Sequence, residues 1–391
     1  FWGRRFRRLM PASLVCLLGV AVLFAPFVAD PSQLSRLPGD VAASVFDVAN
    51  WRFVASGQSY EALFSSPSPV LHFWSLAIEE QFYLLFPLLV AAVVVRWGRS
   101  GRVLTALFVG LAVASTVEMA WLYDPADTAR VYYGTDTRAA ELLVGAVLAM
   151  GWANPRWRQW LRRGVWPVLG AVALVATLWV WHTTSQTDAW LYRGGFALYA
   201  LGSAAIIVAA IQPGVVRAVL SVPPLRWLGS ISYAVYLFHW PVFLWLTPTR
   251  TGLDPWPLFG LRVAITLALA QISLVILEQP VRQRRLFTGR TPLWLAPLTA
   301  ITILTTTTIT SQAAPGTTEL RTADQPTEFV APAPTLAPGS DGPESAGPTA
   351  VPPPPPSTLV VGDSMAVSLN GGLERWVGEH GGIRVLNAGT V

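Results

Sequence analysis

Residues 70–95 read VLHFWSLAIEEQFYLLFPLLVAAVVV, and this stretch decides the fold. A helix needs about 20 mostly apolar residues to cross a hydrocarbon layer about 30 Å thick, so the stretch is long enough to span one. It also carries His72, Glu79 and Glu80, and ionisable groups inside a membrane cost free energy unless they are paired or hydrated. The stretch therefore predicts a membrane helix with functional groups.

Eight further stretches of the chain have the same apolar character. The nine predicted spans are 9–29, 70–95, 103–123, 138–153, 164–182, 194–211, 228–247, 258–277 and 293–310. Hydrophobic residues make up 53% of the chain and charged residues only 13%, about half the charged share of a soluble domain. An ordinary soluble domain is excluded, and the predicted fold class of residues 1–310 is an all-α polytopic membrane domain.

The arginines predict which way the spans run. All 27 basic residues are arginine, and 17 of the 24 in residues 1–310 lie in alternate loops, at 4–8, 96–102, 156–163, 217–226 and 282–290. Short basic loops stay in the cytoplasm, so an odd number of spans places everything after residue 310 outside it. The basic part is also the apolar part, which favours contact with a lipid bilayer over binding of nucleic acid.

The composition changes after residue 310. Residues 311–357 hold 12 prolines and one aromatic residue, which predicts an extended, extracytoplasmic proline-rich linker. Residues 358–391 then show a short apolar strand, a Gly362-Asp363-Ser364 turn, a helix and a second strand. This order predicts the start of an α/β domain.

Polar residues inside the spans are the first candidates for a site. On a helix, Glu79 and Tyr83 each fall within about 20° of His72. The alternative is a purely structural contact in which Glu79 accepts hydrogen bonds from a neighbouring helix. His239 lies near the middle of span 228–247, where an imidazole suits proton transfer, but it can equally donate to a carbonyl that Pro241 leaves free.

Other candidates have equally plain structural alternatives. Arg138 and Glu141 are three residues apart and can pair with each other. Ser364, on a turn between strand and helix, is a candidate nucleophile, with its own N–H and that of Gly389 as oxyanion donors, although Gly-Asp-Ser is also common in plain turns. No His or Cys cluster has metal-ligand spacing, so no metal and no bound cofactor are expected.

Five separated motifs follow one another along residues 1–280: FWGRRFRRLMPA at 1–12, WSLAIEEQFYL at 74–84, YGTDTRA at 133–139, ISYAVYLFHWP at 231–241 and LEQP at 277–280. Taken together, they resemble the bacterial acyltransferase family 3 membrane O-acyltransferases. The tail resembles the SGNH hydrolase-like domain often fused to that family, with Gly-Asp-Ser at 362–364 and Asn-Ala-Gly at 387–389.

The resemblance implies an enzyme of the bacterial plasma membrane. It would move an acyl group, usually acetyl, from cytoplasmic acyl-CoA to a hydroxyl of a cell-surface polysaccharide, peptidoglycan or glycolipid. The implied catalytic residues are Ser364, Gly389, His239 and Glu79, and the implied substrate-binding residues are Arg5, Arg8, Arg138, His72 and Tyr83. The family's catalytic His and the final Asp-x-x-His of the SGNH-like domain are expected outside residues 1–391, so residues 1–391 alone are expected to be inactive.

Two other functions fit the same pattern. A transporter or flippase of glycan precursors would also place His and Glu inside a helical bundle, although the sequence shows no evident inverted repeat. A membrane anchor that presents a glycan-binding domain on a proline-rich stalk would need no catalytic residue. Transfer of an acyl label to the glycan separates an acyltransferase from both.

Overall fold

A computed structural model describes residues 2–57, 66–98, 100–283, 291–312, 357–360 and 384–387. The elements are α1 (Trp2–Gly19), α2 (Ala25–Phe27), α3 (Pro31–Val45), α4 (Ala49–Ser56), α5 (Phe73–Trp97), α6 (Gly101–Leu122), α7 (Ala129–Tyr133), α8 (Thr135–Ala153), α9 (Pro155–Leu161), α10 (Val165–Thr183), α11 (Phe196–Ala210), α12 (Val215–Leu220), α13 (Pro223–Trp245), α14 (Pro248–Thr251), α15 (Pro255–Ile272), α16 (Gln279–Arg282), α17 (Thr291–Gln312), β1 (Ser357–Val360) and β2 (Arg384–Asn387). Three π-helical turns lie at Val20–Phe24, Leu191–Gly195 and Ser273–Glu278.

Helices cover all nine ranges in which the sequence predicts spans. Within the described residues, six helical segments are long and apolar enough to cross a membrane: Trp2–Phe27, Phe73–Trp97, Gly101–Leu122, Val165–Thr183, Leu191–Ala210 and Pro255–Arg282. The remaining three predicted ranges coincide with α8, α13 and α17. The polytopic helical class is thus confirmed, and the count of nine spans stays a prediction.

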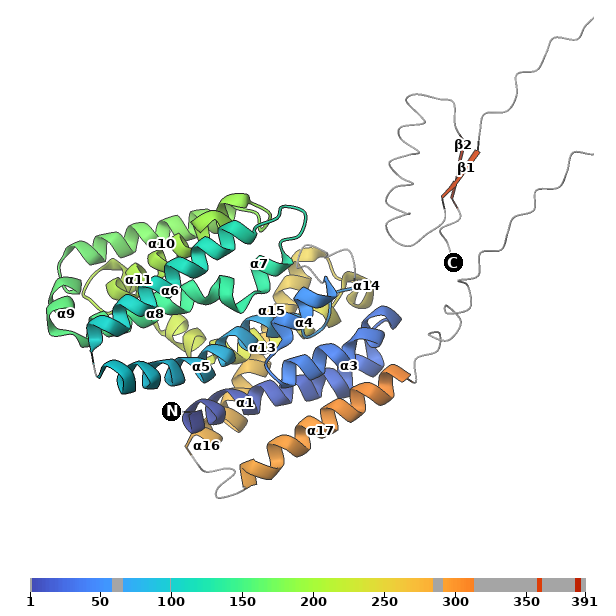
Figure 1. The fold of residues 1–391 in the computed structure, drawn as a ribbon. Helices are drawn as coiled ribbons and strands as arrows, with labels where there is room; N and C mark the ends of the chain where they lie inside the picture. The colour runs from blue at the N-terminus through green and yellow to red at the C-terminus, as the bar shows by residue number, and fades with distance from the viewer. Residues whose placement is uncertain are drawn as a thin grey trace, which may run out of the picture. The chain divides into compact units, whose positions relative to one another are not determined.

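The helices assemble side by side in one unit. Contacts divide the chain into Phe1–Arg321 and Thr322–Val391. In the first unit, α6 packs on α8, α10 on α11 and α13 on α15, while α17 runs along α3 and α1 (Figure 1). In the second, β1 and β2 pair in parallel, from Ser357 opposite Arg384 to Val360 opposite Asn387.

The segment 30–69, which lies between the predicted spans 9–29 and 70–95, contributes α3 and α4 to the core. Asp30 begins α3 with a capping box, because its side chain accepts from the Gln33 N–H while the Gln33 side chain accepts from the Asp30 N–H. The buried Asp40 of α3 is then paired with Arg52 of α4, with 3.1 Å between Oδ1 and Nε. Pairing the charges inside the segment lets its apolar residues join the main core.

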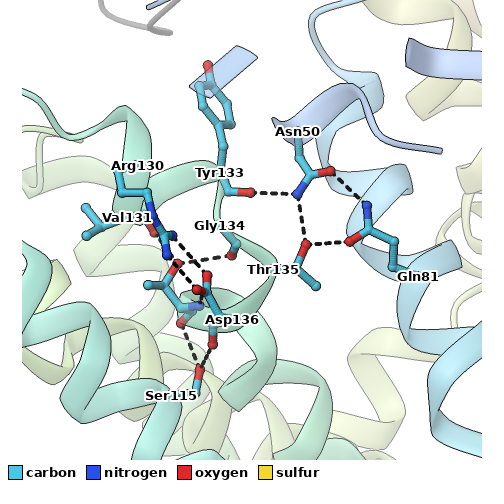
Figure 2. A network of polar contacts seen from close by, with 10 residues as sticks. Asn50, Gln81, Ser115, Arg130, Val131, Tyr133, Gly134, Thr135 and Asp136 are labelled. Carbon is cyan, nitrogen blue, oxygen red and sulfur yellow. Dashed lines mark hydrogen bonds and ion pairs between the residues drawn. The ribbon is translucent and has the colours of Figure 1, made fainter. Parts of the chain in front are cut away.

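A polar network joins α4, α5 and the α7–α8 corner, as Figure 2 shows. The fully buried Asn50 donates to the Tyr133 carbonyl at 3.0 Å and to Thr135 Oγ1 at 2.9 Å, and accepts from Gln81 Nε2 at 2.9 Å. Thr135 Oγ1 in turn donates to Gln81 Oε1 at 2.6 Å. Each polar group therefore has a partner, as a buried network requires.

The same corner continues into α6 through Asp136. Arg130 forms an ion pair with both carboxylate oxygens of Asp136, and the Ser115 hydroxyl donates to the Asp136 carbonyl (Figure 2). Although partial burial opposes ionisation, the hydrogen bond from Arg130 holds the pKa of Asp136 below its usual value. The corner thus connects α6, α7 and α8 and fixes where α8 begins.

Replacing Asn50 by Ala is expected to destabilise the bundle. The change removes two donors and one acceptor from a buried network, which costs about 1–3 kcal/mol for a polar group left unpaired. Thermal unfolding of the purified protein in detergent measures the loss, with Gln159→Ala on the exposed face of α9 as the matched amide control. Equal unfolding temperatures for Asn50→Ala and the parent chain would contradict the assignment.

Candidate functional site

The centre of the site is a carbonyl group that α13 leaves without a helical partner. Pro241 has no N–H, so the Leu237 carbonyl four residues earlier cannot form its helical hydrogen bond. His72 Nε2 lies 3.0 Å from this oxygen, and Cys16 Sγ donates to it at 3.2 Å. The fully buried His72, which immediately precedes α5, is therefore held against α13.

His239 lies beside His72. Their ring centroids are 5.6 Å apart, and His239 Nδ1 lies 2.6 Å from the Tyr236 carbonyl. The Tyr236 hydroxyl donates to the His72 carbonyl at 2.7 Å and also contacts the Ser75 hydroxyl. His72 and His239, which lie far apart in the chain, thus form one cluster, which we call the histidine pair.

The acceptors fix the tautomer of each ring. A carbonyl oxygen only accepts, so His72 is protonated at Nε2 and His239 at Nδ1. In the neutral rings, His72 Nδ1 and His239 Nε2 then carry the free lone pairs. His72 Nδ1 is buried with no hydrogen-bond partner among the described residues, whereas the half-buried His239 can meet a substrate.

The sequence left two roles open for His239: proton transfer near the middle of its span, or donation to the carbonyl that Pro241 leaves free. A histidine does donate to the carbonyl that Pro241 frees, but it is His72. Moreover, α13 begins at Pro223 rather than residue 228, because proline suits the first turn of a helix. His239 is therefore 16 residues from the start of α13 and six from its last residue, Trp245, closer to one end than predicted.

A second cluster lies where α1 begins, and we call it the arginine cluster. The Arg5 guanidinium lies 4.0 Å from the centre of the Tyr83 ring, and Trp2 Nε1 donates to the Tyr83 carbonyl at 3.0 Å. Glu79 lies within hydrogen-bonding reach of Tyr83 and is attracted by Arg5 and Arg8. The structure thus brings Glu79 and Tyr83 together, as predicted, but pairs His72 with His239 instead.

Arg138 occupies an aromatic cage. Its guanidinium carbon lies 4.2 Å from the ring centre of Phe196, 5.3 Å from that of Tyr132 and 5.5 Å from that of Trp74. Its Nη1 also pairs with Glu141 Oε1 at 3.2 Å, the i,i+3 contact expected as the structural alternative. The cage fixes the guanidinium by cation–π attraction, so Arg138 holds a permanent positive charge in place.

A cavity of about 250 Å³ adjoins these elements. It is bounded by α1, α3, α5, α13 and α17, and most of its lining is apolar, with Ser13, Ser44, Asp47, Glu80 and Tyr233 as the polar exceptions. Burial raises the pKa of the Asp47 carboxyl to about 6. A small acyl group fits a cavity of this size and composition.

Several residues of the site escaped the sequence reasoning. Asp47, Gln81 and Tyr236 were not singled out, although Gln81 stands directly after the Glu79-Glu80 pair and Tyr236 three positions before His239. The predicted Ser364 and Gly389 lie outside the described residues. Among the described residues, no group of three His, Cys, Asp or Glu side chains is placed to hold a metal ion.

Among the described residues, six helical segments long and apolar enough to span a bilayer indicate a multi-pass membrane protein, whose largely apolar core also buries polar side chains such as Asp40 and His72. A family model described as an acyltransferase domain matches residues 1–275, and the chain belongs to this acyltransferase family.

Curated relatives support the assignment to this family. The chain is 38% identical over 290 residues to the peptidoglycan O-acetyltransferase OatA of Listeria monocytogenes, covering 72% of this chain and 46% of that protein. It is 36% identical over 311 residues to the putative peptidoglycan O-acetyltransferase YrhL of Bacillus subtilis, covering 75% and 48%. It is 30% identical over 289 residues to the O-acetyltransferase OatA of Staphylococcus aureus, covering 73% and 47%. The chain thus spans about half the length of these relatives, and no solved structure matches it.

Asp47→Asn is expected to stabilise the protein at neutral pH. The carboxyl has a pKa of about 6 in the fold and about 3.9 when unfolded, so its stabilising effect is complete below pH 3.9 and is lost as the pH rises through 6. An amide escapes this loss and tolerates the positive φ of 54° at this position. The Asn variant should therefore unfold at a higher temperature than the parent chain at pH 8, with a much smaller difference at about pH 4.5.

Asp47→Ala is the matched control for the backbone. Alanine also removes the charge, but the left-handed conformation costs it about 1–2 kcal/mol. We expect the Asn variant to unfold at a higher temperature than the Ala variant at both pH values. If the stability advantage of the Asn variant over the parent chain is the same at both pH values, the role of the buried carboxyl is refuted.

Proposed function

We propose that the protein is a membrane O-acetyltransferase that passes an acetyl group from cytoplasmic acyl-CoA across the membrane to a hydroxyl of peptidoglycan. Membership of the acyltransferase family supports acyl transfer, and the names of its relatives favour acetyl and peptidoglycan. The proposal includes nine spans, cytoplasmic arginine-rich loops and an extracytoplasmic C-terminal part. Under this proposal, the described helices carry the transfer through the membrane.

The arginine cluster is the proposed donor end. Acyl-CoA carries several phosphates, and guanidinium groups bind phosphate through paired, charge-assisted hydrogen bonds. Arg8 is exposed and Arg5 is half-buried, which leaves both able to meet an anion from solution. In this scheme Glu79 and Tyr83 orient Arg5, because the carboxylate attracts the guanidinium that lies over the phenol ring.

The histidine pair is the observation that carries the proposed chemistry. With Nδ1–H directed at the Tyr236 carbonyl, His239 keeps Nε2 free to accept a proton from an attacking hydroxyl. The new oxygen–acyl bond forms as the thioester or ester bond of the donor breaks, and the imidazolium then returns the proton to the leaving group. His72 positions His239 through ring contact, and Arg138, whose charge the aromatic cage fixes, is proposed to bind substrate.

The C-terminal part completes the scheme. An SGNH hydrolase-like domain would take the acetyl group on Ser364, with the N–H groups of Ser364 and Gly389 as oxyanion donors, and deliver it to the glycan. Support for this step comes from the sequence alone, since both residues lie outside the described part of the chain. As an extended linker, residues 311–357 would allow this domain to contact peptidoglycan at a distance from the membrane.

The test replaces His239 by Ala in the chromosomal gene. General base catalysis contributes about 10²–10⁴ in rate, so base-released acetate from purified peptidoglycan should fall to background while the protein stays in the membrane at its usual level. His182→Ala is the matched control, because His182 is exposed at the end of α10.

The outcomes separate the proposed function from its rivals. A normal acetate content of the peptidoglycan in the His239→Ala strain would contradict the role of His239 as the general base. Labelled acetyl-CoA given to membrane vesicles of the wild-type strain should label the glycan if the protein transfers acetyl groups. A transporter or a glycan-binding anchor would leave the glycan unlabelled, and loss of the gene would not change its acetate content.

A further inference from the structure

Arg262 is a charged residue inside an apolar helical segment, and it takes no part in the histidine pair, the arginine cluster or the aromatic cage. It lies seven residues after Pro255, the first residue of α15, which is about 10 Å along the helix. The segment Pro255–Arg282 is long and apolar enough to cross a membrane. A guanidinium at such a depth is costly unless it is partnered, so an arginine there marks a functional position by default.

The partners of Arg262 come from the end of α13. Its Nε donates to the Leu246 carbonyl at 2.9 Å, and its guanidinium carbon lies 5.0 Å from the ring centre of Phe243. Leu246 directly follows Trp245, the last residue of α13, and the last carbonyls of a helix have no partner within it. Arg262 forms no ion pair among the described residues. Its charge therefore faces an aromatic ring and the negative end of a helix, both of which attract a cation.

The end of α13 needs this anchor because it follows Pro241. Pro241 cannot donate to the Leu237 carbonyl, so the residues after it are joined to the rest of α13 by one backbone hydrogen bond fewer. Arg262 holds these residues against α15 at two points, the Leu246 carbonyl and the Phe243 ring. Arg262 thus attaches the weakened end of α13 to a neighbouring helix.

The Phe243 ring also contacts the ring of His239. The ring centres are 6.4 Å apart and the ring planes differ by 68°, which is an edge-to-face contact. His239 makes the same kind of contact with His72, at 5.6 Å and 73°. The guanidinium of Arg262, the ring of Phe243 and the imidazole of His239 therefore form a continuous series of contacts. A shift of the Phe243 ring would change where the imidazole lies.

We propose that Arg262 is a positioning residue, which sets where the His239 ring lies through Phe243 and the end of α13. This role rests on the proposed function, in which His239 is the general base. Arg262 contacts neither donor nor acceptor in this scheme, and it acts only by holding the imidazole where the transfer needs it. Misplacement of a reacting group by about 1 Å can cost about a hundredfold in rate, so an anchor two contacts away affects the reaction.

The first measurement is the labelling of His239 by diethyl pyrocarbonate, read by mass spectrometry, in membrane vesicles that hold the full-length protein. The reagent attacks an unprotonated imidazole nitrogen, and His239 offers Nε2 because Nδ1 donates to the Tyr236 carbonyl. Arg262→Met keeps a long side chain but removes the charge and the donors, so His239 should be labelled at least about threefold faster. The exposed His182 is the internal reference and should be labelled equally in all variants.

The second measurement is the transfer of labelled acetyl groups from acetyl-CoA in the same vesicles. In Arg262→Met, kcat per protein molecule should fall about tenfold because the base is misplaced, while KM for acetyl-CoA stays unchanged because the donor end is untouched. Arg262→Lys keeps a cation for the Phe243 ring and an N–H for the Leu246 carbonyl. It should therefore restore most of both properties.

Arg250→Met is the matched control. Arg250 also stabilises the end of a neighbouring helix, because its Nη1 and Nη2 donate to the Phe27 and Val28 carbonyls at 3.3 and 3.0 Å. Its loss removes comparable support, but at the end of α2 rather than of α13. Arg250→Met should leave the labelling of His239 and kcat as they are in the unmodified protein.

The results separate the positioning role from the proposed function. Unchanged labelling of His239 or an unchanged kcat in Arg262→Met would overturn the role, as would equal losses in Arg250→Met. Vesicles of the unmodified protein that transfer no acetyl group would instead refute the proposed function, and the labelling would still test whether Arg262 positions His239.

A second variant decides the outcome if Arg262→Met does not accumulate in the membrane. Phe243→Leu removes the ring that joins Arg262 to His239 and keeps the Leu246 carbonyl as an acceptor for Arg262. Faster labelling of His239 together with a lower kcat in this variant would support the role. Values equal to those of the unmodified protein would overturn it.

Discussion

The bundle depends on carbonyl groups that prolines leave without a helical partner. Pro241 frees the Leu237 carbonyl of α13, which His72 and Cys16 then satisfy. Pro87 lies inside α5 and likewise frees the Tyr83 carbonyl, to which Trp2 donates. In apolar surroundings an unpaired carbonyl costs several kcal/mol, so each freed group needs a donor from another element. Because Trp2 and Cys16 both belong to α1, that helix is joined to α5 near its first residue and to α13 near its last turns.

These attachments also place the chemistry. The histidine pair forms where α5 begins against α13, and the arginine cluster forms where α1 begins against α5. The cavity of about 250 Å³ is bounded by the same three helices together with α3 and α17. A freed carbonyl thus fixes each end of the proposed path, and membership of the acyltransferase family supports acyl transfer as its chemistry.

The sequence predicted the positions of the helices well, because length and apolar character are local properties. It did not predict α3 and α4, because segment 30–69 lies between the long apolar stretches and its Asp40 and Arg52 are paired only in the fold. It also anticipated that a histidine would use the carbonyl freed by Pro241, yet chose His239 rather than His72, which stands 165 residues before Leu237. A proline in the sequence indicates that the carbonyl four residues earlier lacks its helical hydrogen bond. Only the folded structure shows which side chain donates to that carbonyl, here His72.

The central claim is that the Leu237 carbonyl positions the histidine pair for acyl transfer. The most direct test is the acetate content of peptidoglycan from a strain with Pro241→Ala in the chromosomal gene, compared with Pro38→Ala inside α3. Alanine restores an N–H that competes with His72 for the carbonyl, so acetylation should fall at least about tenfold at unchanged protein level, a cost of about 1.4 kcal/mol in the transfer step. Normal acetylation in the Pro241→Ala strain would contradict the account.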